Sequence, residues 1–434
     1  MRHSLLFVSL TLMAPWAGAA NLSDIHQLAQ ANDPLYAAAK ESYRAGLEAM
    51  PQGKALLRPS INLGGYLRHV DSETSAPSNT DYSTRGYSLS LSQPLYNKVG
   101  WENYQKSKLA VLLAEQQLQV AEQDLLLRVA QAYFNVLLAQ DNLSAAEAQK
   151  KAVSEQLAQA KKTFEVGAAT IVDTHEAQAR FDLATAQEIA ALNDLEVKRR
   201  GLEKLIAQEA PQLSRFNTST SMPLPLPVPN VMADWVSQAE SQSLPVQTSQ
   251  TAAQVALREL DLQRGGYRPT VNLTASYGDD RNTNPSPTAV NSRTGTIGVE
   301  LAWPLYQGGV TDSRVREALA KQEKARHDLE NARRQSALDT RQSFLGVVSG
   351  DAQVKALEQA LVSSESQLKS TKLGLDVGVR TRVDVLNAQQ LVYSTQRDLA
   401  AARYQTLLAS LQLKAAVGAL SAEDLKKLDA LLTP

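Results

Sequence analysis

Four segments of the chain alternate apolar and polar residues with a period of two. They lie in two pairs, near residues 61–65, 87–91, 271–277 and 297–303. Period-two alternation gives a β-strand one apolar face, and the polar stretches 71–81 and 279–292, rich in Ser, Thr, Asn and Pro, favour turns. The pattern therefore predicts two β-hairpins, over residues 58–96 and 268–306. Strands of ~10 residues have the length of a tilted membrane-spanning strand.

After each hairpin the pattern changes to one that is typical of long helices. Residues 98–208 and 309–418 contain no proline and are rich in Ala, Leu, Gln, Glu and Lys, which are good helix formers. Gly167 and Gly378 each divide one stretch into two runs, the first long enough for a helix of ~100 Å. Helices of this length cannot pack inside a globular domain of this mass. We therefore expect two helix pairs that form an elongated bundle or tube.

The unit of hairpin and helix pair occurs twice in the chain. Short motifs recur in the same order at a spacing of about 210 residues. The recurring motifs are Arg58-Pro59-Ser60 with Arg268-Pro269-Thr270, Pro94-Leu95-Tyr96 with Pro304-Leu305-Tyr306, and Val172-Asp173 with Val383-Asp384. We interpret the chain as an internal tandem duplication, a single protomer made of two repeats at about 21–208 and 231–420.

Shorter segments complete the two repeats. Residues 21–51 and 231–265 are expected to be helical, and residues 421–432 to form a short amphipathic helix. The connector between the repeats, residues 209–230, alternates proline with apolar residues over 223–229. This composition favours an extended, polyproline-like spacer on the outside of the helical body, with a PxxP recognition ligand as the alternative.

Residues 1–20 have the pattern of a secretory signal peptide. Arg2 precedes an apolar run over residues 5–16, and small residues end the segment, so we expect cleavage after Ala19 or Ala20. The alternative is an uncleaved anchor helix, but the apolar run is shorter than the ~20 residues that span a bilayer. No later segment has an apolar run of that length. If the mature chain enters a membrane, we expect it to do so as strands.

Composition excludes several classes of function. The 44 Lys and Arg residues balance 45 Asp and Glu residues, for a net charge of −1, which argues against nucleic-acid binding. The chain has no cysteine, which excludes disulfides, thiolate metal sites and a lipid-modified N-terminal Cys. The histidine spacing matches no HExxH-type motif, and the sequence has no nucleophile elbow or phosphate-binding loop. We predict that the protein is not an enzyme and uses no cofactor or metal.

One chain supplies only four predicted strands, too few for a conduit through a membrane. An open sheet in lipid would leave its edge amides without hydrogen-bond partners, and eight-stranded barrels are filled with side chains. Three chains would give twelve strands and an open lumen, and a threefold ring is an ordinary symmetry. We therefore expect a homotrimer. Four aromatic residues near the strand ends form either an interfacial girdle or part of a soluble core: Tyr66, Tyr96, Trp303 and Tyr306.

Taken together, these motifs resemble the TolC family of outer-membrane channel-tunnel proteins. The resemblance rests on the signal peptide, the duplicated hairpins and long helices, the R-P-x-[IV]-N-L strand start, the P-L-Y strand end and the V-G-x-x-T-x-V-D turn. It extends from Asn21 to about Leu432. It implies an α+β membrane protein: a homotrimeric, twelve-stranded outer-membrane β-barrel, with four strands per chain, continued by a long periplasmic α-helical barrel.

The resemblance also implies the role and the partners. Members of the family dock through a periplasmic adaptor (membrane fusion) protein onto an inner-membrane transporter, either an ABC transporter or a proton-driven pump. They export proteins or small toxic molecules. The absence of a lipid-anchored cysteine favours type I protein secretion over drug efflux. The alternative class is a soluble periplasmic coiled-coil adaptor, which the four strands and the lack of an inner-membrane anchor disfavour.

The turns between the long helices carry the candidate functional residues. In the first turn Gly167 permits the backbone to reverse, Thr170 is a predicted helix N-cap, and Asp173 lies three residues further on. The second turn repeats this arrangement with Gly378, Thr381 and Asp384. The spacing is close to that of a capping box, which gives both aspartates a structural role.

The resemblance implies that the same tips close the channel. An arginine of the second tip, here Arg380, bonds to an acid of the first tip on a neighbouring chain, here Asp173. A ring of acids lines the closed aperture in the family. Its first position falls on Asp384 and its second on Asn387, so each chain would give the ring one charge. The alternative is that the aspartates act only as caps.

Other tip residues depart from the family pattern or have no role there. The tyrosine that braces the tip in some members is Leu375 here, and the threonine beside the first acid is Val172. We expect Arg382 to be a solvated residue on the helix surface. His175 is either a pH-sensitive element of the gate or an ordinary exposed helical residue.

Overall fold

The structure, a computed structural model, describes residues 19–72, 80–167, 170–216, 224–283 and 291–433. The chain forms two compact units. The sheet unit comprises residues 39–118 and 245–333, and the helix unit comprises the other described residues. Each unit contains residues from both sequence repeats, so the boundary between the units does not coincide with the boundary between the repeats. The expected signal peptide lies outside the described residues, apart from Ala19 and Ala20.

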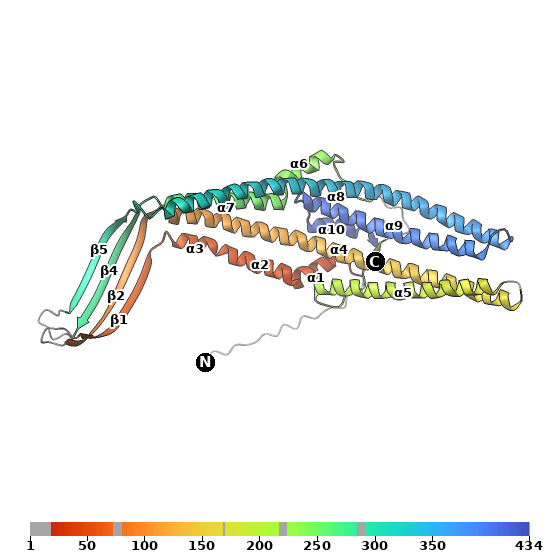
Figure 1. Cartoon of the computed structure of the whole chain (residues 1–434), viewed down its shortest axis with the longest axis horizontal. Helices are drawn as coiled ribbons and strands as arrows, with labels where there is room; N and C mark the ends of the chain where they lie inside the picture. Colours follow the sequence, from red (N-terminus) through yellow and green to blue (C-terminus); the bar gives the residue numbers. More distant parts are fainter. Residues whose placement is uncertain (1–18, 73–79, 168–169, 217–223, 284–290, 434) are drawn as a thin grey trace. The chain divides into compact units, whose positions relative to one another are not determined.

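The sheet unit is built on four antiparallel strands. They are β1 (Ser60–Ser72), β2 (Thr80–Asn97), β4 (Thr270–Asn282) and β5 (Ser292–Ala302). Their order is β1-β2-β4-β5, so the two predicted hairpins lie side by side and β1 and β5 form the edges (Figure 1). The unit also contains helix α3 (Ala49–Ala55) and most of α2 (Pro34–Leu47) and α7 (Leu244–Gly265).

The sheet has one apolar and one polar face. The register pairs Leu63 with Leu89 and Leu89 with Tyr277, and alternation along each strand brings these side chains to one face. That face carries nine exposed apolar side chains: Ile61, Leu63, Leu67, Tyr87, Leu89, Tyr277, Ile297, Val299 and Leu301. The opposite face carries small polar residues, among them Asn62, Ser88, Ser90, Thr274, Ser276 and Thr296. A contiguous apolar face that is left exposed marks a surface that contacts lipid or protein.

The structure corrects one part of the expected aromatic girdle. Tyr66 lies on the polar face, where its hydroxyl donates a hydrogen bond to Oδ1 of Asp280 at 2.7 Å. Two other tyrosines, Tyr87 and Tyr277, lie on the apolar face. The strand period explains this, because Tyr66 is one residue out of step with Leu63 and Leu67.

The two repeats end their second strands differently. β2 continues through Pro94, and its pairing with β4 becomes irregular between Pro94 and Tyr96. Proline has no N–H to donate, so strands tolerate it at such irregularities. β5 instead ends at Ala302, before Pro304. The P-L-Y motif therefore lies within a strand in the first repeat and beyond the sheet in the second.

Two pairs of long helices dominate the helix unit (Figure 1). The pairs are α4 (Lys98–Glu165) with α5 (Ile171–Ile206) and α8 (Val310–Asp376) with α9 (Arg382–Ala416). The short elements are α1 (Leu22–Asn32), α6 (Met232–Gln242), α10 (Ala422–Asp429) and the paired two-residue strands β3 (Arg215–Phe216) and β6 (Leu432–Thr433). No pattern in the sequence indicates β3 or β6. Within the described residues, no helix combines the length and the hydropathy needed to cross a membrane.

The start of the described chain is fixed to the core of the helix unit. Tyr133 of α4 is fully buried, and its hydroxyl donates a hydrogen bond to the carbonyl oxygen of Ser214 at 2.8 Å. Ala20, also fully buried, donates its backbone N–H to the carbonyl oxygen of Gln212 at 2.7 Å. These bonds tie the N-terminal segment and the connector to α4, and α1 then packs against α5 and α10.

Candidate functional site: the tips of the helix pairs

The turn between α4 and α5 is formed by a glycine and a capped helix. Gly167 has φ 76°, a left-handed conformation that glycine adopts without strain. Oγ1 of Thr170 accepts a hydrogen bond from the backbone N–H of Asp173 at 3.3 Å. In return, Oδ2 of Asp173 accepts one from the backbone N–H of Thr170 at 2.9 Å. This reciprocal pair is a capping box at the start of α5.

The turn between α8 and α9 has the same geometry. Gly378 has φ 79°. Oγ1 of Thr381 accepts a hydrogen bond from the backbone N–H of Asp384 at 3.2 Å, and Oδ2 of Asp384 accepts one from the backbone N–H of Thr381 at 2.9 Å. The predicted capping role of the two threonines and the two aspartates is confirmed. It was predictable because capping depends only on residues three apart along the chain.

Both tip aspartates are carboxylates at neutral pH. Hydrogen bonds from the backbone and hydroxyl of Thr170 lower the pKa of Asp173, and those of Thr381 lower the pKa of Asp384. A nearby arginine adds to each effect: the charge of Arg382 lowers the pKa of Asp173, and that of Arg380 lowers the pKa of Asp384. Within one chain, the pKa of Asp173 is therefore lowered in part by an arginine of the other helix pair.

A pocket of about 300 Å³ lies between the two tips of one chain. Its wall includes Asp173 and Glu176 of α5, Lys372 of α8 and Arg382 of α9. Nη1 of Arg382 is buried and has no hydrogen-bond partner among the described residues. The expectation that Arg382 is a solvated surface residue is therefore wrong.

The position of Arg382 follows from the face of α9 on which it lies. Val385 and Leu386, three and four residues further on, are buried, and residues at this spacing share one side of a helix. Leu375, at the position of the family's bracing tyrosine, lines the same pocket. The sequence contained this signal, because the spacing of Arg382 from the two apolar residues was visible there.

Two polar contacts join the helix pairs beside the pocket. Nη2 of Arg180 in α5 lies 3.2 Å from Oδ1 of Asn387 in α9, and 3.1 Å from Oε1 of Glu176. Nε2 of Gln156 in α4 lies 2.6 Å from Oε1 of Gln389 in α9. Of the four residues in these two contacts, only Asn387 was a candidate from the sequence. Arg180, Gln156 and Gln389 were not, because no local pattern reveals which residues of two separate hairpins meet.

Arg380 and His175 both have exposed side chains at the tips. Arg380 lies against Gly374, where a side chain larger than hydrogen would collide with its Cγ atom. Among the described residues of one chain, Arg380 makes no hydrogen bond or ion pair with Asp173. The expected Arg380–Asp173 bond joins two different chains, so it stays a proposal, as does a role for His175.

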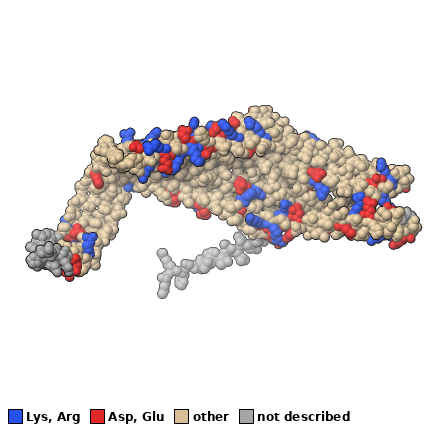
Figure 2. All heavy atoms as spheres, in the orientation of Figure 1, with Lys and Arg blue, Asp and Glu red and all other residues tan. Residues whose placement is uncertain are grey.

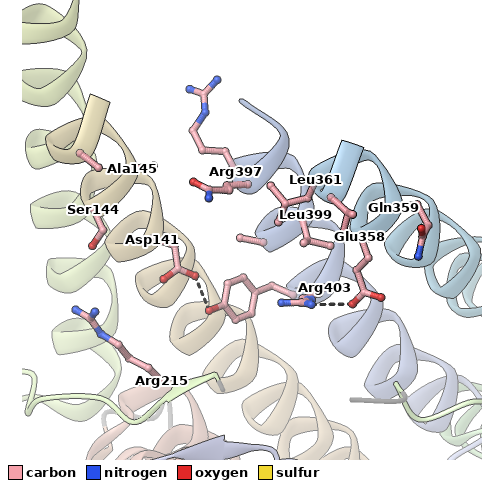
Figure 3. Close-up of a pocket in the computed structure, with 15 residues that line it drawn as sticks. Asp141, Ser144, Ala145, Arg215, Glu358, Gln359, Leu361, Arg397, Leu399 and Arg403 are labelled. Atoms are coloured by element: carbon pink, nitrogen blue, oxygen red, sulfur yellow. Dashed lines mark hydrogen bonds and ion pairs between the residues drawn. The ribbon is translucent and has the colours of Figure 1, made fainter. Parts of the chain in front are cut away.

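A larger pocket lies between the helix pairs near β3, with a volume of about 680 Å³ (Figure 3). On its wall the hydroxyl of Tyr404 in α9 donates a hydrogen bond to Oδ2 of Asp141 in α4 at 2.8 Å. Nη2 of Arg403 lies 2.7 Å from Oε1 of Glu358 in α8. Burial raises the pKa values of Asp141 and Tyr404. These contacts connect α4 to α9 and α9 to α8.

No group of His, Asp or Glu residues in the described ranges has the arrangement of a metal site. Charged residues at the tips instead cap helices or face one another across the two pairs. The chain thus combines a two-faced sheet of four strands with two long helix hairpins that end in charged turns. This combination is that of one protomer of a channel in which helices continue a membrane barrel.

Comparison with known proteins agrees with this class. The family described as "Outer membrane efflux protein" matches residues 25–208 and 235–419, one segment in each repeat. The chain belongs to this family, the TolC family of outer-membrane efflux and secretion channels. The family places the protein in the outer membrane with a periplasmic tunnel, and its members are channels and not enzymes.

Individual relatives extend over nearly the whole chain. Outer membrane protein TolC of Vibrio cholerae is 35% identical over 98% of this chain and 97% of its own length. The alkaline protease secretion protein AprF of Pseudomonas aeruginosa is 32% identical over 96% of this chain and 88% of its own. Among solved structures, the outer membrane channel CmeC of Campylobacter jejuni superposes with a TM-score of 0.81 at 17% identity, covering 94% of this chain and 89% of its own. The structural match supports the fold alone.

Proposed function

We propose that three copies of this chain form the outer-membrane exit duct of an export system. The sheet carries this proposal, because its apolar face is exposed and its edge strands β1 and β5 have no partner strand among the described residues. Contact with lipid would cover the apolar face, and neighbouring copies would supply partner strands for the two edges. Three copies give twelve strands, enough for an open lumen lined by the small polar residues of the other face.

The duct opens by outward movement of the helix tips. The contacts between the pairs near the tips are polar and partly exposed, as in Arg180–Asn387. The contact further along the pairs joins a buried tyrosine, Tyr404, to a half-buried aspartate, Asp141. Exposed polar links are worth well under ~1 kcal/mol each, so the tips separate more readily than the region around Tyr404.

In the closed state Arg380 bonds to Asp173 of the neighbouring chain, and Asp384 and Asn387 line the aperture. The exposure of Arg380 and the ionised state of Asp173 support this arrangement. Three copies of a weak link at one constriction are enough to bias a two-state equilibrium towards the closed state. Docking of a periplasmic adaptor protein on the tips competes for these links.

The cargo is a protein exported by type I secretion, small toxic compounds, or both. AprF is named for alkaline protease secretion, and PrtF of Dickeya chrysanthemi, 29% identical over 98% of this chain, for secretion of proteases. BepC of Brucella suis, 27% identical over 88% of this chain, is named for efflux. The chain has no cysteine for a lipid anchor. We therefore favour protein secretion, with an inner-membrane ABC transporter as partner, over a proton-driven pump.

Single-channel conductance of the purified protein in a planar bilayer tests the proposal. We expect a small conductance in the wild type and a larger one in Arg380→Ser, with the trimer intact. Arg200→Ser is the matched control, because among the described residues Arg200 pairs only with Glu196 and Glu203 of its own helix. Equal conductance of wild type and Arg380→Ser would contradict the gate. Absence of any channel from a folded protein would contradict the duct and favour a soluble periplasmic adaptor.

A further inference from the structure

Three arginines form a cluster at the loop end of the sheet, on its apolar face. The register places Arg85 of β2 directly opposite Arg281 of β4, and Asp279 of β4 directly opposite Arg293 of β5. We call Arg85, Arg281 and Arg293 the arginine belt. Neighbouring strands are ~4.8 Å apart, so the three arginines lie on three adjacent strands whose backbones span ~10 Å.

On β2, β4 and β5 the belt lies where the apolar band of this face ends, whereas β1 still has Leu67 opposite Arg85. Along β2 the alternate residues Leu89, Tyr87 and Arg85 share the face, and Tyr277, Asp279 and Arg281 do so along β4. Tyrosine is enriched at the boundary between hydrocarbon and headgroups. In Figure 2 the strands are largely tan, and charged atoms reappear at the loop end of the sheet. The order of apolar band, tyrosine and arginine matches the order of hydrocarbon, interface and headgroup in a bilayer.

One carboxylate only partly balances these charges. Asp279 is buried between two arginines, with its Oδ1 3.1 Å from Nε of Arg281 and its Oδ2 2.8 Å from Nε of Arg293. The side chains of Arg281 and Arg293 remain 52% and 69% exposed, which leaves their Nη atoms available. Arg85 is exposed and makes no hydrogen bond or ion pair with any residue that the structure describes. The cluster therefore has two positive charges in excess.

The next acidic residues on this face do not reach the belt. Asp81 lies four residues beyond Arg85 on β2, and its Oδ1 pairs with Nε2 of His69 at 3.1 Å. Asp71 lies opposite Asp81, at the same distance along the sheet. Four residues of a strand measure ~13 Å, which is too far for a hydrogen bond to Arg85.

Like charges directly opposite each other destabilise a sheet. Arginine cannot relieve this by losing its proton, since it stays protonated in proteins. An anion between Arg85 and Arg281 removes the repulsion. Guanidinium groups bind phosphate through paired, charge-assisted hydrogen bonds, and phosphate is the anion found just outside the hydrocarbon of a bilayer.

The polar face at the same level has no such excess. Arg68 stacks on the ring of Tyr66, at 5.9 Å from its centroid, and Tyr66 bonds to Asp280. Arg68 therefore has a partner within the chain and faces away from the belt.

We propose that Arg85, Arg281 and Arg293 bind the phosphate groups of a membrane-lipid headgroup in the leaflet around the loop end of the strands. This inference rests on the proposed barrel, which turns the apolar face towards lipid. The bound headgroup neutralises the Arg85–Arg281 pair and fixes the depth of the barrel in the membrane.

Native mass spectrometry of the detergent-purified protein tests the inference with diphosphoryl lipid A, a lipid with two headgroup phosphates, as the probe. We expect the wild type to retain the lipid and the triple variant Arg85→Gln, Arg281→Gln, Arg293→Gln to retain it at least about tenfold more weakly. Arg68→Gln, at the same level on the other face, is the matched control and should bind as the wild type does. Because Arg85 makes no bond with any residue that the structure describes, the single variant Arg85→Gln should fold normally and still lose most of the lipid.

Two further arms separate the possible outcomes. Dephosphorylated lipid A should not be retained, and millimolar inorganic phosphate should not displace the lipid. Equal retention by the wild type and the triple variant, or by the phosphorylated and dephosphorylated lipids, would overturn the inference. Displacement by free phosphate would show an anion site without lipid specificity and would overturn it too. The same spectra report the mass of the protein. A monomer would contradict the proposed trimer. A trimer that retains lipid regardless of its phosphates would contradict only the proposed role of the arginine belt.

Discussion

The hydroxyl of Tyr404 in α9 donates a hydrogen bond to the carboxylate of Asp141 in α4, across the space between the two helix pairs. The ring of Tyr404 also stacks on Phe134 of α4, with 5.8 Å between the ring centroids. Tyr404 is only 5% exposed. We call this contact between a buried tyrosine and a half-buried aspartate the joint between the pairs; the Arg180–Asn387 link near the tips is exposed.

Tyr404→Phe should destabilise the protein by about 1–3 kcal/mol. The ring and its stacking on Phe134 remain, but Asp141 loses its hydrogen-bond donor in a half-buried position. The loss should be larger at pH 8 than at a pH low enough to protonate Asp141. Burial raises the pKa of Asp141, and a neutral carboxyl left without a donor costs less free energy than a carboxylate. Thermal unfolding in detergent at both pH values measures this. Tyr43→Phe is the control, since the Tyr43 hydroxyl bonds to no described residue, and a loss of the same size there would refute the role of the joint.

Stability should fall as the pH drops from 7.5 to 5.5, in part because of His26. This side chain in α1 is 6% exposed, its Nε2 is buried without a hydrogen-bond partner among the described residues, and burial lowers its pKa. Below the ordinary pKa of ~6.5 the unfolded chain binds a proton that the folded chain does not, so protons favour unfolding. His26→Leu should reduce the pH dependence of the unfolding midpoint over this range. His175→Leu, at an exposed position, should leave it as in the wild type.

Arg180→Ala should make the closed channel easier to open. The change removes the bond of Arg180 to Asn387, which joins α5 to α9 within one chain. An exposed link of up to ~1 kcal/mol corresponds to a rise in the open population of up to about fivefold per copy. Single-channel recordings give the open probability directly. If the open probability of Arg180→Ala equals that of an Arg200→Ala control, the link has no part in gating.

Two glycine-to-alanine changes should have opposite effects. Gly378 has φ 79°, so Gly378→Ala should cost about 1–2 kcal/mol at the second tip. Gly201 lies within α5, and a Cβ atom there meets nothing within 4 Å. Gly201→Ala should therefore stabilise α5 by about 0.5–1 kcal/mol. Hydrogen exchange of the amides near each position measures both, and the same sign for the two variants would contradict the turn geometry.

Features that depend on neighbours along the chain were predictable from the sequence alone. Alternation in β1 and β2 predicted two strands with one apolar face, because side chains of a strand alternate regardless of their surroundings. The spacing of Thr170 and Asp173 predicted a capping box, because both partners belong to the same turn. The duplication was also visible, since each repeat carries the same local signals.

Which residues of the two repeats meet depends instead on tertiary packing. The spacing of Arg382 from Val385 and Leu386 indicates which face of α9 it lies on, but not that it borders a pocket with Asp173. The bond between Tyr404 and Asp141 joins residues 263 positions apart. The pairing of Arg85 with Arg281 likewise depends on the register between β2 and β4, which come from different repeats. A periodic pattern specifies which face of an element is apolar. The partner that the face meets is set by the packing of helix pairs and the register of strands, and both depend on contacts between distant parts of the chain.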